Sequence, residues 1–258
     1  MRVGVLTTAA GQGSTHVAAA LAWEAAAGMA TVAVDADPNV GTLGELFALE
    51  PDARLSSVWG PTGVSAGALQ SVMTRVAGRE QLQVVAGFDR PVVEWPAVLE
   101  ALASALPQLD CDLVVVDMGA PFGQVRGAPP LGVALGTVFD AVVLVLGSAP
   151  DLLWRSIRLL DASPLPRTRV VLMRPRGERG GQVEALVRRE LPWLPPFVEW
   201  TVDGRAMLAA QEAHRPVLRR GGLLGELGLT GHVRVGSTRG RGFARWRRPA
   251  VKGVEGDA

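Results

Sequence analysis

The chain has almost no lysine, a single cysteine and no long apolar run, and each shortage excludes a class of site or location. Lys252 is the only lysine among 26 basic residues, so residues 1–251 contain no amine side chain. Cys111 is the only cysteine, which excludes an internal disulfide and a paired-thiol metal site, and we expect it to pack as a small apolar residue at a strand edge. No apolar run reaches the ~18 residues needed to span a bilayer, and no signal-peptide pattern is present, so we expect a cytoplasmic location.

The 258 residues alternate apolar, strand-like runs with amphipathic, helix-like stretches, which is typical of a parallel sheet covered on both faces. Residues 113–116 and 141–146 are apolar at consecutive positions, as expected of buried central strands. We therefore predict a doubly wound α/β domain over residues 1–220, with a mostly parallel sheet flanked by helices. The predicted strands are 2–8, 30–35, 82–86, 112–117, 140–146, 168–173 and 196–200, and the predicted helices are 14–27, 42–48, 96–106, 151–161, 181–190 and 204–214.

Residues 221–258 are rich in glycine and arginine and lose the periodicity of the preceding chain, so we predict a disordered tail. Seven of the 26 basic residues and two of the 25 acidic residues follow residue 228, which makes the tail basic and the rest of the chain mildly acidic. Arginines interleaved with aromatic residues suit a membrane surface, nucleic acid or an acidic protein, and they also suit a solvated tail without a ligand. The residues concerned are Arg239, Arg241, Arg245, Trp246, Arg247 and Arg248.

The segment between the first predicted strand and the first predicted helix has the pattern of a phosphate-binding loop that lacks its lysine. It runs from Ala9 to His16, after an apolar strand and before an Ala-rich helix. Glycines at positions 11 and 13 would let backbone N–H groups curve around an anion at the helix N-terminus. The sequence therefore predicts a phosphate cradle without the cation that usually accompanies it.

Three further segments place acidic residues and turns directly after predicted strands. Asp35 ends the second strand and Asp37 follows it, Asp117 ends the fourth, and residues 200–204 lead into the last helix. Together with the loop, and in this order, the segments resemble the MinD/ParA family of deviant Walker A P-loop ATPases. Members of that family position division sites, plasmids, chromosomes, flagella and pili. The resemblance covers residues 1–220.

The resemblance implies a site for ATP or ADP with Mg²⁺ that two replacements weaken. The family has lysines where this chain has Ala9 and Ser14; the first reaches across an ATP-bound dimer, and the second contacts the β- and γ-phosphates. A charge-assisted hydrogen bond contributes about 1.5–3 kcal/mol, so we expect weak nucleotide binding and little or no hydrolysis. The residues implied in nucleotide binding are Gly11, Gln12, Gly13, Ser14, Thr15, His16 and Arg174, the last beside the position of an Asn that helps to read adenine.

The carboxylates, in contrast, match the family pattern. The resemblance assigns Mg²⁺ binding to Thr15, Asp35 and Asp117, and it places Asp37 where the family has the aspartate associated with the attacking water. Hydroxyl and carboxylate oxygens are the ligands that Mg²⁺ prefers. The alternative is that acidic residues at strand ends cap the helices that follow them.

The resemblance leaves three functions open. We favour a positioning or assembly scaffold of the division, partition or pilus-localisation type, which acts through protein partners with little or no ATPase activity. The alternatives are an active Mg²⁺-dependent ATPase, in which a partner's arginine replaces the lysine, and a partition protein whose basic tail binds DNA. Because the family's nucleotide-sandwiched dimer uses the lysine that Ala9 replaces, any homodimer should form without ATP. A lipid-binding tail would place the protein at the inner membrane surface.

Overall fold

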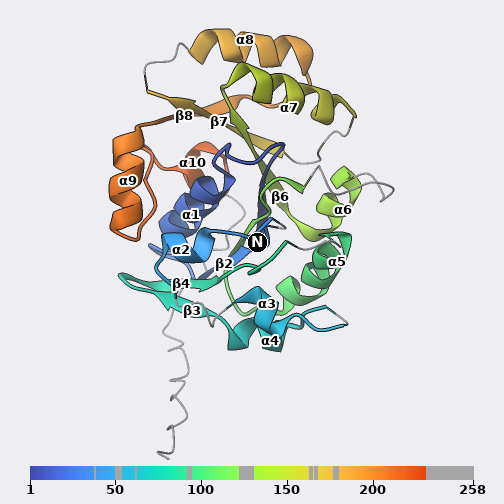
Figure 1. The fold of residues 1–258 in the computed structure, drawn as a ribbon, viewed down its shortest axis with the longest axis vertical. Coiled ribbons are helices and arrows are strands. Elements are labelled where there is room, and N and C mark those ends of the chain that lie inside the picture. Colours follow the sequence, from blue (N-terminus) through green and yellow to red (C-terminus); the bar gives the residue numbers. More distant parts are fainter. Residues whose placement is uncertain are drawn as a thin grey trace, which may run out of the picture.

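A computed structural model describes residues 1–37, 39–49, 54–61, 63–91, 95–121, 131–162, 165, 168–176 and 180–230. Its strands are β1 (Arg2–Thr7), β2 (Thr31–Asp35), β3 (Thr74–Val76), β4 (Arg79–Val85), β5 (Leu113–Asp117), β6 (Ala141–Gly147), β7 (Thr168–Pro175) and β8 (Phe197–Val202). They form one sheet in the order β3-β4-β2-β5-β1-β6-β7-β8 (Figure 1). Only the β3–β4 pair is antiparallel. The predicted doubly wound, mostly parallel α/β sheet is confirmed.

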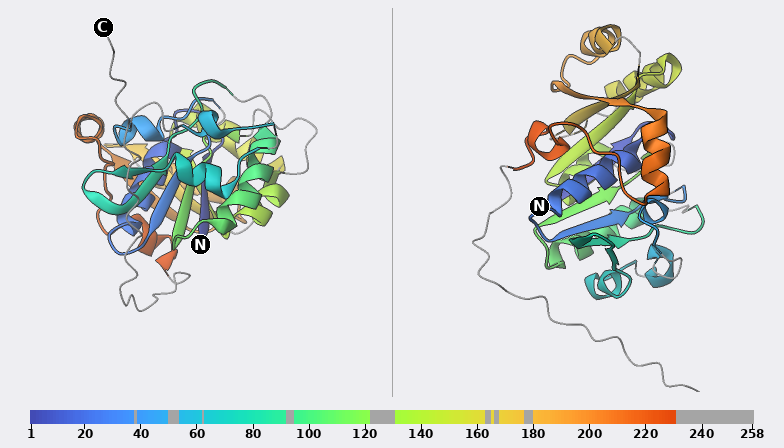
Figure 2. Two further views of the ribbon diagram at one scale, coloured as in Figure 1. Left: turned by 90° about the horizontal axis from the view of Figure 1, so that it is seen from below. Right: turned by 90° about the vertical axis from the view of Figure 1, so that its left-hand side faces the viewer.

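Helices cover both faces of the sheet (Figure 2). The buried apolar side chains form two cores. The first face carries α1 (Ser14–Ala25), α2 (Leu43–Leu46) and α10 (Leu223–Glu226). The second carries α3 (Leu55–Val58), α4 (Ala66–Ser71), α5 (Trp95–Ala105), α6 (Leu131–Val138), α7 (Pro150–Ala162) and α8 (Gly180–Glu190), with the 3₁₀ turn Leu106–Gln108. A further helix, α9 (Gly204–Glu212), buries none of its residues.

The central strands explain why the sequence runs apolar at consecutive positions. Successive side chains of a strand point to opposite faces, so Val5 of β1 enters one core and Leu6 enters the other. β5 and β6 flank β1 and are buried at every position except the last residue of β6. This arrangement places the carboxyl ends of β1, β2 and β5 at one edge, which is where the loop and the aspartates lie.

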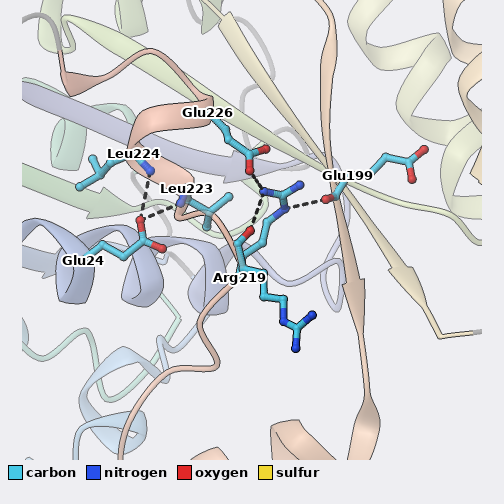
Figure 3. Close-up of polar contacts among 7 residues, drawn as sticks. Glu24, Glu199, Arg219, Leu223, Leu224 and Glu226 are labelled. Carbon is cyan, nitrogen blue, oxygen red and sulfur yellow. Dashed lines mark hydrogen bonds and ion pairs between the residues drawn. The ribbon is translucent and has the colours of Figure 1, made fainter.

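The C-terminal segment, residues 219–229, corrects the predicted domain boundary at residue 220. Leu223, Leu224, Leu227 and Leu229 are buried and belong to the core that α1 shares. The Glu24 carboxylate of α1 accepts hydrogen bonds from the backbone N–H groups of Leu223 and Leu224, at 2.7 and 3.1 Å (Figure 3). The folded domain therefore reaches Thr230, because these leucines complete one of its cores.

Some elements of the structure were not predicted, and some predictions concern residues that the structure does not describe. The strand β3 and the helices α3, α4, α6 and α10 were not predicted, and all but α6 are too short to show a clear period. The basic side chains of the predicted tail lie beyond residue 230, outside the described residues. Within the described ranges, no helix is long and apolar enough to cross a membrane.

Candidate functional site

The loop between β1 and α1 has the backbone of an anion cradle. Gly11 and Gly13 have φ values of 81° and 93°, which residues with side chains rarely adopt. Gly13 is the N-cap of α1, and no side chain caps this helix end. The first turn of α1 also contains no acidic residue. The N–H groups of this turn and the helix dipole therefore favour an anion here.

Four buried polar side chains form a hydrogen-bonded network with the loop. They are Thr7, Thr8, Gln12 and Ser156, each at most 3% exposed, and we call them the loop network. Gln12 Oε1 accepts hydrogen bonds from the Thr7 and Thr8 hydroxyls, and Gln12 Nε2 donates to Ser156 Oγ at 3.4 Å. The Thr8 and Ser156 hydroxyls also hydrogen-bond to each other. Gln12 therefore anchors the loop through its side chain, a role that the sequence did not indicate.

Asp117 ends β5 beneath the loop and is fully buried. Its Oδ1 accepts a hydrogen bond from the Gly119 N–H at 3.2 Å, whereas its Oδ2 has no hydrogen-bond partner. Burial raises the pKa of Asp117 to about 6, and the Thr15 hydroxyl and the Gly119 N–H oppose that rise. An orphaned carboxylate oxygen next to Thr15 fits a divalent cation, which prefers hard oxygen ligands.

Asp35 is also fully buried, but its carboxylate is occupied by backbone donors. Oδ2 accepts from the Leu43 N–H at 2.9 Å, and Oδ1 accepts from the Asp37 N–H at 3.3 Å. A Cβ at Gly41 would overlap this carboxylate, so glycine is required there. Burial raises the pKa of Asp35 well above its usual range, and the neighbouring Asp117 raises it further. Asp35 thus orders the turn that leads into α2, while its metal role stays a prediction.

The Asp37 carboxylate lies against Gly119, in the turn that follows Asp117. Its Oδ1 accepts hydrogen bonds from the Asn39 backbone N–H at 2.8 Å and from Asn39 Nδ2 at 3.4 Å. A Cβ at Gly119 would overlap the Asp37 carboxylate, which shows how closely the two turns approach. Burial raises the pKa of Asp37, and its charge in turn raises that of Asp117. The structure thus brings the predicted catalytic and metal carboxylates together.

Solved structures with the same fold were found, although no model of a protein family and no curated protein matches the sequence. A ParA family ATPase from Chlorobium tepidum TLS is 18% identical, with a TM-score of 0.65, over 85% of this chain and 91% of that chain. MinD in the MinC:MinD cell division complex from Aquifex aeolicus is 16% identical, with a TM-score of 0.57, over 84% and 87%. The septum site-determining protein MinD from Pyrococcus horikoshii OT3, complexed with Mg-ADP, is 14% identical, with a TM-score of 0.53, over 84% and 87%.

The chain has the MinD/ParA fold. The resemblance is thereby confirmed at the level of the fold. Identities of this size carry over the architecture and not the chemistry, so each site residue has to be judged by its surroundings in this chain.

In this MinD/ParA fold, the two positions assigned to lysine are occupied by small, buried side chains. Ala9 and Ser14 are each 6% exposed, and Ser14 is the first residue of α1. His16, three residues after Gly13, is partly buried, and burial lowers its pKa, which favours the neutral imidazole. A phosphate at the loop would therefore meet backbone N–H groups and hydroxyls at the positions assigned to the two lysines.

Arg174 of β7 was predicted to contact the nucleotide base, and its guanidinium lies against Glu199 of β8. Nε donates to Glu199 Oε2 at 3.1 Å, and Nη2 lies 3.0 Å from the same oxygen. Met173, the preceding residue, is the one that borders the loop, since a Cβ at Gly13 would lie 3.2 Å from its Cε. Contact between Arg174 and a nucleotide stays a prediction.

The donor set fits a Mg²⁺ ion only in part. No cluster of three or more His, Cys, Asp or Glu side chains suited to a metal is found among the described residues. Thr15 and the free oxygen of Asp117 would supply two protein oxygens, directly or through water, and Mg²⁺ commonly keeps several waters and binds phosphate oxygens. Mg²⁺ would thus bind here together with a phosphate ligand rather than alone.

Proposed function

We propose that this protein is a MinD/ParA-type positioning or assembly scaffold that acts through protein contacts and hydrolyses ATP weakly or not at all. The observation that carries the proposal is the cation-free loop: Ala9 and Ser14 are buried where the resemblance places lysines. The only lysine of the chain, Lys252, lies outside the described residues. Phosphoryl transfer depends on stabilising the developing negative charge, so a site without these two cations has lost its main means of catalysis.

The groups of the site that match the family pattern support weak binding of Mg²⁺ with ATP or ADP. The glycine backbone, the Thr15 hydroxyl and the unpaired Asp117 oxygen would hold the phosphates and the ion. A structural neighbour was solved in complex with Mg-ADP, which supports a nucleotide as the ligand of this site. We therefore expect binding without efficient turnover.

Protein partners and a homodimer belong to the same proposal. The MinD neighbour in a complex with MinC supports assembly through protein contacts. The exposed apolar side chains Trp154, Trp193, Leu208 and Leu218 are candidates for such contacts. Because Ala9 cannot reach across a dimer to a phosphate, the dimer would form without nucleotide.

The second candidate, an active Mg²⁺-dependent ATPase, is favoured by Asp37 and Asp117, which lie together beside the loop. An arginine from a partner would then supply the missing positive charge. A steady-state phosphate-release assay separates the two functions. Turnover that exceeds background and disappears in Asp37→Ala would exclude the scaffold proposal, whereas equal rates for both proteins would support it.

A further inference from the structure

Helix α9 follows the edge strand β8 and lies on the outside of the molecule (Figure 1). None of its nine residues is buried, and none belongs to either of the two cores. Isolated helices shorter than about 12–15 residues are marginal in water, because most helix stability in proteins comes from packing of one face. In this chain, α9 therefore lacks the burial that usually stabilises a helix.

The chain itself fixes the two ends of α9. At its start, Asp203 Oδ1 accepts a hydrogen bond from the Arg205 backbone N–H at 2.9 Å. At its end, the Arg215 N–H donates to the Ala210 carbonyl at 3.0 Å. Met207 and Ala210 are partly buried, so they mark the side of α9 that faces the rest of the chain. The opposite side is open to a contact from outside.

That opposite side of α9 carries a stripe with opposite charges at its two ends. We call it the α9 stripe, and its members are spaced i, i+3, i+4 and i+7: Arg205, Leu208, Ala209 and Glu212. All four are exposed, and Leu208 is 63% exposed. Residues at these spacings share one face of a helix, so the two apolar side chains lie between the arginine and the glutamate.

The two charges of the α9 stripe oppose the dipole of their own helix. Arg205 is in the first turn and Glu212 ends the last, whereas a helix favours acidic residues at its start and basic residues at its end. Neither side chain forms an ion pair with another described residue. This placement lowers the stability of α9 alone, and a contact outside the helix that uses both charges explains it.

A second copy of the chain matches the α9 stripe in charge and in shape. When two α9 helices pair antiparallel about a two-fold axis, Arg205 meets the partner's Glu212 at both ends at once. Leu208 then packs against the partner's Ala209, and the two helix dipoles run in opposite directions. Because the stripe is neutral overall, it offers no electrostatic advantage to the basic tail of the chain, to DNA or to an anionic membrane.

From this self-complementarity we infer that two copies of the chain associate through the α9 stripe as an antiparallel helix pair. The stripe contains no residue of the loop site, so the dimer forms without nucleotide. The inference rests on the proposed scaffold role, because it names the surface through which the nucleotide-independent dimer forms. One pair of nine-residue helices is small for a protein interface, so we expect a dissociation constant of about 10–1,000 μM.

Sedimentation equilibrium of the full chain, at concentrations from about 10 μM to about 1 mM, measures this dimer. Arg205→Glu or Glu212→Arg alone places like charges opposite each other at both ends, and each should raise the dissociation constant at least about tenfold. An equimolar mixture of these two variant chains restores both opposite-charge pairs and should associate as tightly as the natural chain. Arg220→Glu is the matched control, because Arg220 is exposed outside the α9 stripe, and it should leave the dimer unchanged. Circular dichroism establishes that each variant is folded.

Disulfide cross-linking tests the antiparallel orientation of the two helices. In the proposed pair, residue 208 of one copy lies opposite residue 209 of the other. A mixture of Leu208→Cys and Ala209→Cys chains, with oxidised glutathione as the oxidant, should therefore cross-link faster than Gln211→Cys chains, whose cysteine lies at the side of α9. Burial raises the pKa of the native Cys111 to about 11, which keeps this thiol slow to react.

Several outcomes would overturn the inference. They are the absence of a dimer at about 1 mM, a dimer that requires Mg²⁺-ATP, and a dissociation constant that the α9 variants do not change. Binding of anionic vesicles or duplex DNA that the same variants abolish would overturn it too, because α9 would then serve that ligand. Phosphate release measured on the same samples reports on the scaffold proposal separately, since an active ATPase can form this dimer and an inactive scaffold can lack it.

Discussion

Truncation of the chain tests whether residues 221–230 belong to the folded domain. A chain that ends at residue 220 loses four leucines that are at most 7% exposed, together with the two hydrogen bonds that Glu24 accepts. Removing one buried leucine side chain costs about 2–5 kcal/mol, and a domain has only about 5–15 kcal/mol in total. We therefore expect the chain of residues 1–220 to be unfolded. The chain of residues 1–230 keeps every described contact and should unfold cooperatively.

A point variant tests the same assignment through a measurable change in the free energy of unfolding. Leu223 is completely buried, so Leu223→Ala should lower the free energy of unfolding in urea by about 3 kcal/mol. Leu208→Ala is the control: Leu208 lies on α9, is 63% exposed and should change the value by less than about 0.5 kcal/mol. A Leu223→Ala protein as stable as the natural chain would refute the assignment of residues 219–229 to the core. Cooperative unfolding of the chain of residues 1–220 would refute it as well.

Three further outcomes follow from the buried polar groups. Burial raises the pKa of Asp117 to about 6 in the folded state, so the folded protein holds this proton more tightly than the unfolded chain does. The free energy of unfolding in urea should therefore fall as the pH rises from about 4 to 7, and Asp117→Asn should make this fall less steep. An unchanged slope would contradict this reasoning. Gly41→Ala should cost about 1–3 kcal/mol in the same assay, because its Cβ overlaps Asp35, and full stability would contradict this contact. Ser156→Ala should cost about 1–3 kcal/mol by leaving Thr8 and Gln12 short of a partner, while Ser156→Thr should lose less.

The architecture was predictable because the pattern of apolar residues follows directly from the burial of a parallel sheet. Every predicted strand and helix has a counterpart in the structure, and the bounds differ by a few residues at the ends. The aspartates came together as expected, since the carboxyl ends of parallel strands meet at one edge of the sheet. β3 escaped prediction because its three residues are too short to show alternation.

The contacts between distant side chains were not predictable from local pattern. The resemblance assigned Gln12 to nucleotide binding, and only the fold shows Ser156 beside its side chain. The resemblance assigned Arg174 to the nucleotide, whereas its contact with Glu199 depends on the pairing of β7 with β8, which is not visible in the sequence. The leucines of the C-terminal segment lie among glycines and arginines that suggested a tail.

The central claim is that the phosphate side of the site is weakened by the loss of its lysines, and calorimetric titration tests it directly. Mg²⁺-ATP and Mg²⁺-ADP should bind the natural chain weakly. The double variant Ala9→Lys, Ser14→Lys should bind Mg²⁺-ATP at least about tenfold more tightly, because a charge-assisted hydrogen bond contributes about 1.5–3 kcal/mol. Tight binding by the natural chain, with no gain in the double variant, would contradict the account.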